Sequence, residues 1–408
     1  MAARHDVNSL DASILCWDDW FWSLTRAACL CCLHSAFCTG LHSSTFVCSA
    51  LPSALLSIMD RWWWLYVQAV FWRFLMRIGM FFHAISPPRP PSPSFTRSIP
   101  VGDDGAGRKI VLYFYCPPDF SSRRKEGQRL PVVVNFHGGG FTLGCATDDG
   151  RWANCIIHEV GAVVVSVGYR RAPEFPFPAA VDDGVDALLY LSKNAAELGL
   201  DVSRVVLSGF SAGGNLAVTV PLRLRDRLIR EVYPYPISTP STASTTSLNP
   251  GDSTARLVDP SGDLAIVGLF CWYPILDFEE SRDHRRQSSI FPDKTLPAFF
   301  TTLFDDSYLP NLQERKSPYA SPVRAPSAIL ADALPHDIFL YICEWDMLLK
   351  EGQNFVLQLQ GVGKRVRAMM IEKACHAWDK SPNPFRDQYK VDILYQDACA
   401  DMKAIFEH

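Results

Sequence analysis

Short apolar runs rich in valine, isoleucine and aromatic residues recur from residue 110 onwards, with stretches of helical spacing between them. Runs of this length between turn residues are typical of strands that are buried on both faces. The runs occupy residues 110–115, 132–136, 162–167, 205–207, 265–270, 338–342 and 366–371. Strands that alternate with helices in this way predict an α/β fold with a mostly parallel central sheet, covered by helices on both faces.

The beginning of the chain has a different pattern. Residues 27–59 contain no charged side chain, and residues 61–82 are dense in tryptophan and phenylalanine. A proline-rich segment at 87–93 then interrupts any helix, because consecutive prolines favour extended backbone. We therefore expect a hydrophobic N-terminal arm over residues 1–95 and the main domain over residues 96–408.

This arm allows three interpretations. The uncharged stretch is long enough to span a bilayer, which takes about 20 apolar residues. The Trp/Arg segment also fits a helix lying at a membrane interface, or a cap helix packed over the mouth of a site.

A secretory signal begins with basic residues, whereas Asp6 and Asp11 lie near the start of this chain. We expect an intracellular protein that is not secreted; if the arm binds membrane, the endoplasmic reticulum or another lipid surface is the expected place.

Two later segments interrupt the series of strands. Residues 237–263 are rich in Ser, Thr, Pro and Gly, which predicts a flexible insertion. Residues 278–335 are too long for a simple connection and predict an inserted lid.

Composition excludes some classes of function. Hydrophobic residues make up 48% of the 408 residues, enough for a large core, and the net charge of −4 does not fit a nucleic-acid-binding surface. The 13 cysteines are odd in number and crowd toward the start, so we expect no disulfide framework. The cysteines at 29, 31 and 32 have no partnering run of histidines, so no metal site is predicted.

The segment GFSAG at residues 209–213 follows a predicted strand and precedes an apolar helical start. This context is what the G-x-S-x-G motif requires, because it holds a serine on a strained turn between strand and helix. Ser211 is therefore the predicted nucleophile.

A second glycine-rich segment, HGGGF at residues 137–141, directly follows another predicted strand. The backbone N–H groups of Gly138 and Gly139, with that of Ala212, are predicted to stabilise an oxyanion, at about 3 to 4 kcal/mol for a donor of this kind. A phosphate-binding loop is the competing interpretation, but no Gly-Lys-Ser/Thr ending or G-x-G-x-x-G pattern is present.

A serine hydroxyl needs a base to accept its proton and a carboxylate to orient that base. Asp346 and His376 each follow a predicted strand near the end of the chain, in the order Ser, Asp, His. Their nearest competitors are Glu344 and Asp379. Other histidines that could act as a base are His137, His158, His284, His336 and His408, and each is more often an ordinary surface or cap residue.

With these motifs in order, the chain resembles the hormone-sensitive-lipase group of α/β-hydrolases, in particular a fungal-type esterase branch. The resemblance covers about residues 96–400 and is carried by HGGGFTLG, YRRAPEFPFPAAVDD, GFSAGGN and EWDMLLKEG. It implies an α/β-hydrolase fold with a helical cap from the arm and the insertion, and ester hydrolysis through Ser211, His376 and Asp346 without a cofactor. The chain departs from the group at Phe210, usually acidic, and at Ala377-Trp378, usually Gly-Phe.

The resulting expectation is a carboxylic ester hydrolase whose partner is a small lipophilic acyl ester. One alternative is a tailoring enzyme that deacylates a terpenoid or sterol or transfers an acyl group to it. Another is a non-catalytic ligand receptor on the same fold, as in the plant gibberellin receptors of this family. Such a receptor typically lacks a working histidine, whereas His376 is present.

Overall fold

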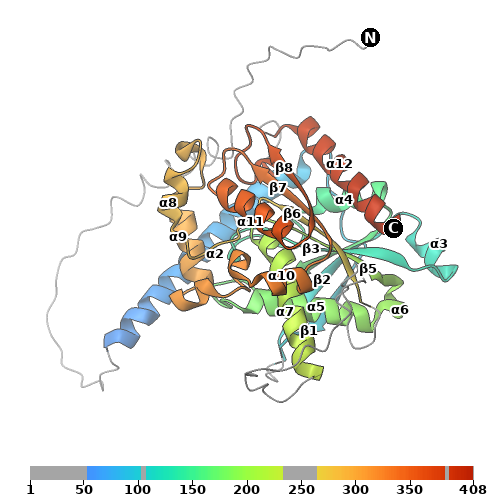
Figure 1. Cartoon of the computed structure of the whole chain (residues 1–408), viewed down its shortest axis with the longest axis horizontal. Helices are drawn as coiled ribbons and strands as arrows, with labels where there is room; N and C mark the ends of the chain where they lie inside the picture. The colour runs from blue at the N-terminus through green and yellow to red at the C-terminus, as the bar shows by residue number, and fades with distance from the viewer. Residues whose placement is uncertain (1–52, 103–106, 233–263, 382–385, 408) are drawn as a thin grey trace, which may run out of the picture.

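A single sheet of eight strands forms the centre of the molecule. The computed structural model describes residues 53–102, 107–232, 264–381 and 386–407 (Figure 1). The strand order is β1-β2-β4-β3-β5-β6-β7-β8; β1 pairs with β2 and β2 with β4 antiparallel, and the other neighbours are parallel. The strands are β1 (Phe95–Pro100), β2 (Lys109–Tyr115), β3 (Leu130–Phe136), β4 (Val163–Gly168), β5 (Leu200–Phe210), β6 (Ile266–Trp272), β7 (Asp337–Cys343) and β8 (Arg365–Ile371). The predicted mostly parallel sheet is confirmed.

Strand β1 is the one strand of this sheet that the hydrophobic pattern missed. Its sequence FTRSIP buries only Ile99 fully, because β1 is an edge strand with one neighbour. A short polar edge strand carries too little apolar signal to be recognised from the sequence.

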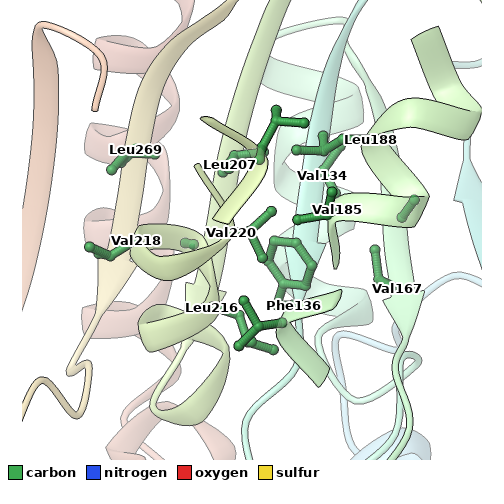
Figure 2. Close-up of a cluster of buried hydrophobic side chains, with 14 of the residues drawn as sticks. Val134, Phe136, Val167, Val185, Leu188, Leu207, Leu216, Val218, Val220 and Leu269 are labelled. Carbon is green, nitrogen blue, oxygen red and sulfur yellow. The ribbon is translucent and has the colours of Figure 1, made fainter. Parts of the chain in front are cut away.

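The central strands are apolar throughout because both faces of the sheet are covered. All seven residues of β3 are buried. Val134 and Phe136 face one layer of helices, and Val133 belongs to the cluster on the opposite face. Figure 2 shows the first of these clusters, in which Val134 and Phe136 meet Val185 and Val220 from two covering helices.

Helices from distant parts of the sequence make up the two layers. On the first face lie α5 (Ala179–Lys193), α7 (Ala212–Val232), α10 (Ser327–Ala333) and α11 (Leu349–Gly361), and on the second face α4 (Gly150–Glu159) and α12 (Gln388–Glu407). The short helices α3 (Phe120–Lys125) and α6 (Ala195–Leu198) contribute Phe120, Ala195 and Leu198 to the cluster on the first face.

A long helix, α2 (Ser53–Ile85), packs against α9 (Ala298–Tyr308) of the later insertion, which also contains the short helix α8 (Arg282–Gln287). Trp72 of α2 packs on the rings of Phe299 and Phe300, with centroids 5.2 and 4.7 Å apart. In Figure 1 the start of α2, in blue, projects beyond the rest of the molecule. Among the described residues, Arg61–Ile85 of this helix is long and apolar enough to cross a membrane, judged by length and composition alone.

Two of the segments singled out in the sequence lie wholly or largely outside the described residues. The uncharged stretch up to residue 52 and the Ser/Thr-rich insertion at 237–263 lie outside the described residues. Their predicted roles, and the domain boundaries drawn from them, stay predictions.

Candidate active site

Ser211 occupies the turn between β5 and α7. Its φ of 54° is in the left-handed region, and its N–H donates to the carbonyl of Trp272 at 2.8 Å. The turn is tight: a Cβ on Gly213 would lie 1.9 Å from the carbonyl oxygen of Phe136. Only glycine fits at position 213, so close packing of the backbone explains why the motif contains glycine there. The surrounding backbone keeps Ser211 in its strained conformation.

The structure brings Ser211, His376 and Asp346 together. His376 Nε2 lies 2.8 Å from Ser211 Oγ, and His376 Nδ1 lies 2.6 Å from Asp346 Oδ2. The Asp346 side chain is 1% exposed and that of His376 is 6% exposed, so water competes little with these contacts. With Nδ1–H donating to the carboxylate, Nε2 is free to accept the serine proton.

The sheet explains how residues so far apart in sequence meet. β7 and β8 are neighbouring parallel strands, and Asp346 and His376 follow their carboxyl ends. In such sheets the loops at this edge gather at one site. Asp346 is held further by the N–H of Leu348, which donates to Oδ1 at 3.1 Å, and the ring of Tyr273 packs edge-on against His376 at 4.9 Å.

The glycine-rich loop after β3 lies against the serine. A Cβ on Gly138 would be 3.6 Å from that of Ser211, and Gly139 has a φ of 112° that favours glycine. The carbonyl of Gly139 accepts hydrogen bonds from the N–H groups of Thr142 and Leu143, which fixes the turn. Ala212 is the first residue of α7, where N–H groups have no acceptor within the helix.

His137 holds this loop in place and is not the base, because its ring contacts the loop and Tyr169. Its Nδ1 lies 2.8 Å from the carbonyl oxygen of Gly138, and its ring stacks on Tyr169 at 4.1 Å. Burial lowers the pKa of His137 to about 3, so the imidazole stays neutral. The Tyr169 hydroxyl donates to the His137 carbonyl, which anchors the start of the loop.

The other candidates from the sequence have different partners. Glu344 accepts the N–H of Lys373, and Asp379 accepts the hydroxyls of Tyr273 and Tyr395, at 2.5 Å each. His158 bonds to its own helix, His284 and His336 lie at the surface, and His408 is outside the described residues.

A buried cluster of charged side chains lies beside the site, and the sequence analysis did not identify it. Lys380 Nζ lies 2.7 Å from Asp149 and 3.1 Å from Asp379, and 3.6 Å above the ring of Phe210. Burial disfavours the ammonium, but the two carboxylates outweigh it and raise the pKa of Lys380. Lys380 lies four residues after His376, so the sequence could have placed it near the site. Asp149 is 231 positions from Lys380, and nothing in the sequence links the two. The ring of Phe210, the residue before the nucleophile, therefore makes a cation–π contact with Lys380.

Two adjoining cavities open at Ser211 and His376. The larger is walled mainly by apolar side chains from α2, the insertion and the loop after β3, and Asp148, Asp149 and Lys380 also line it. The apolar wall consists of Trp72, Met76, Met80, Leu143, Leu296, Phe300 and Phe304. The smaller cavity reaches the same two residues from another side, past Phe278 and Met347. A bond held at Ser211 therefore has room on both sides.

Comparisons with known proteins agree with this arrangement. A family model of the α/β-hydrolase fold matches residues 133–380. Esterase LipI of Mycobacterium tuberculosis is 39% identical over 142 residues, 34% of this chain and 42% of that protein, so the chain matches less than half the length of this relative.

Other relatives are matched over more of their length. Probable carboxylesterase 6 of Arabidopsis thaliana is 31% identical over 279 residues, 64% of this chain and 69% of that protein. The structure of an esterase from Pyrobaculum calidifontis superimposes with a TM-score of 0.63 at 27% identity, covering 83% of this chain and 93% of that one. The chain belongs to the α/β-hydrolase fold family, in its hormone-sensitive-lipase-like group.

Proposed function

We propose that this protein is a serine carboxylesterase that hydrolyses small lipophilic acyl esters through Ser211, His376 and Asp346. One observation carries the proposal: the continuous chain of hydrogen-bonding contacts from Ser211 Oγ through His376 to Asp346, at 2.8 and 2.6 Å. The matches to proteins named esterases and carboxylesterases support the same reaction class.

The reaction follows from the positions of the protons. His376 Nε2 accepts the Ser211 proton as Oγ attacks the carbonyl carbon of the ester, and Asp346 stabilises the imidazolium that forms. The tetrahedral intermediate then expels the alkoxide, which takes the proton from His376 and leaves as the alcohol. Water, deprotonated by His376, attacks the acyl-enzyme and releases the acid, which returns Ser211 to its starting state.

The negative oxygen of the intermediate needs donors that are already in place. The N–H groups of Gly138 and Gly139 lie on the loop beside Ser211, and that of Ala212 begins α7. The positive end of the α7 dipole adds to their effect. Donors of this type lower the barrier because they need no reorganisation during the reaction.

The cavity walls support a lipophilic substrate. Trp72, Met76 and Phe304 present hydrocarbon and aromatic surface near Ser211. Burying apolar surface is worth about 25 cal/mol per Å², so an alkyl or terpenoid group gains affinity there. A polar substituent would lose its hydration against these walls.

Hydrolysis of p-nitrophenyl acetate and butyrate tests the proposal. We expect turnover by the full chain, loss of at least about a thousandfold in Ser211→Ala, and no change in Ser98→Ala, whose serine is exposed on edge strand β1. Full activity in Ser211→Ala would refute the assignment.

Labelling by a fluorophosphonate separates the esterase from a ligand receptor. An activated serine reacts stoichiometrically, and the contact between His376 and Ser211 favours such activation. We expect one label per chain in the wild type and none in Ser211→Ala. An unlabelled wild-type protein would favour the receptor.

A further inference from the structure

One face of α2 is apolar and uncovered among the described residues. At about 100° per residue, ten exposed side chains from Trp63 to Ile85 fall on one side of this helix. They define the outward face: Trp63, Trp64, Val67, Val70, Phe71, Phe74, Ile78, Phe81, Phe82 and Ile85. Trp64, Phe74 and Phe81 are 63%, 62% and 61% exposed. Single exposed apolar residues are ordinary, but a continuous row about 33 Å long marks an interaction surface.

The opposite face of α2 is fixed to the protein. Arg73 forms two hydrogen bonds to Glu174 and one each to the carbonyls of Thr142 and Ala172. His83 is buried between the guanidinium groups of Arg151 and Arg386. A helix that crossed a bilayer would have to give up these contacts, so α2 as it is packed here can only lie along a surface.

The pocket wall lies on that same inner face. Trp72, Met76 and Met80 line the cavity that contains Ser211. The helix therefore separates the cavity from whatever covers its outward face. The exposed apolar surface also continues onto the insertion, where Phe299 stacks on Trp72 and where Leu296 and Pro297 line the cavity.

The side chains of the outward face are of the kinds that bind a lipid surface. Six of the ten residues of the row are tryptophan or phenylalanine, and these residues are favoured at the boundary between headgroups and acyl chains. From Arg61 to Ile85 the helix has three arginines and no acidic residue. Arg77 is exposed at the margin of the row and has no carboxylate within ion-pair distance among the described residues. A cation there complements an anionic phospholipid headgroup.

We propose that the outward face of α2 docks this protein on the surface of a phospholipid bilayer that contains anionic lipids. The helix lies in the plane of the interface, with its aromatic side chains among the upper acyl chains and Arg77 at the headgroups. The cavity then lies directly behind the lipid-bound helix, and a lipophilic ester from the lipid phase can reach it past Leu296 and Pro297 of the insertion, which line it. This last step rests on the proposed esterase function, whereas the docking itself does not.

Co-flotation of the full chain with vesicles tests the docking. The vesicles contain phosphatidylcholine alone or phosphatidylcholine with phosphatidylserine. We expect the wild type to float with the anionic vesicles, and Phe74→Asp combined with Phe81→Asp to reduce binding roughly tenfold or more. Leu357→Asp combined with Tyr389→Asp is the matched control, since these side chains are 67% and 76% exposed on α11 and α12. We expect the control to float like the wild type.

A charge variant provides a second measurement. Arg77→Glu keeps the apolar row and an exposed side chain, so it tests the headgroup contact without a risk to folding. We expect it to bind several-fold more weakly to vesicles with phosphatidylserine and to lose the preference for them over phosphatidylcholine alone.

Three results would overturn the docking. The first is equal flotation of the α2 double variant and the wild type; the second is a preference for phosphatidylserine that Arg77→Glu leaves unchanged. The third is a wild-type dimer that the α2 double variant turns into a monomer, because the face would then join two copies of the chain. Turnover of soluble p-nitrophenyl butyrate is measured on each variant and remains as in the wild type. Because flotation needs no turnover, an inactive protein that floats would refute the esterase proposal alone.

Discussion

Three carboxyl groups lie near His376 in sequence or in space, and their partners give them different tasks. Asp346 contacts the imidazole, while Asp379 is held by Lys380 and two tyrosine hydroxyls. Glu344 lies nearer its strand and accepts a backbone N–H at the surface. Burial acts to raise the pKa of Asp379, but Lys380 and the tyrosines outweigh it and lower that pKa, so Asp379 is a fixed anion of the charged cluster.

Asp346→Asn tests this division of tasks at the scale of one residue. The amide keeps the shape but can donate to Nδ1, which favours the imidazole tautomer with its proton on Nε2. We expect kcat to fall by about a thousandfold to ten-thousandfold. Glu344→Gln is the matched control, with an expected change below about threefold. Turnover of p-nitrophenyl butyrate and the melting temperature are measured on both; equal losses in kcat would contradict the assignment of Asp346.

At the scale of the element, α2 is held by polar contacts as much as by packing. His83, near its end, is buried against Arg151 and Arg386. Burial, and then these two guanidinium groups, lower the pKa of His83 to about 3. The folded protein therefore contains a neutral imidazole where the unfolded chain contains one that titrates near pH 6.5.

This difference predicts a pH-dependent contribution to stability. Between about pH 6.5 and 3 the unfolded chain binds a proton at His83 that the folded protein does not bind. The free energy of unfolding therefore falls as the pH is lowered through this window, by up to about 1.4 kcal/mol per pH unit from this residue. His83→Gln removes the titration and retains an acceptor for an arginine. Urea unfolding at several pH values from 5 to 7.5 measures the effect.

We expect the free-energy difference between wild type and His83→Gln to shift in favour of the variant as the pH falls. Comparing the two proteins cancels the other titrating groups, including Asp148 and Glu351, whose pKa values burial raises to about 6 and about 7. Parallel curves for the two proteins would contradict a neutral, buried His83.

At the scale of the whole molecule, the larger cavity is assembled from segments far apart in the chain. α2 supplies Trp72, the insertion supplies Phe300 and Phe304, and the loop after β3 supplies Gly140, against which Phe304 packs so closely that a Cβ there would overlap its ring. The size of the cavity is therefore a property of how α2 and the insertion pack together.

Trp72→Ala tests whether this packing limits the acyl chain. Removing the indole enlarges the cavity between α2 and α9, so we expect kcat/KM for p-nitrophenyl octanoate relative to butyrate to rise by roughly tenfold. Trp64→Ala on the outward face of the same helix is the control and leaves the ratio unchanged. A ratio that stays constant in Trp72→Ala would show that the acyl chain lies elsewhere, such as in the smaller cavity.

The sequence alone determined the parts of this protein that depend on neighbouring residues. Each central strand is apolar because both of its faces are buried, and the turn at Ser211 requires small residues within its own few positions, so both leave a local pattern. Asp346 was found because it follows the buried strand β7, and His376 because it follows β8, an edge strand that still contains an apolar run. The edge strand β1 left no comparable pattern, because only one of its faces needs apolar residues.

The tertiary structure decided what depends on contacts between distant segments. It joined Lys380 to Asp149 across 231 positions, and it gave Asp346 and Asp379 different partners. It also settled which side of α2 faces the cavity and which side is exposed, since an almost uniformly apolar helix contains no internal signal for its orientation. Burial and charge pairing arise only once the chain has folded, so a linear pattern cannot specify them.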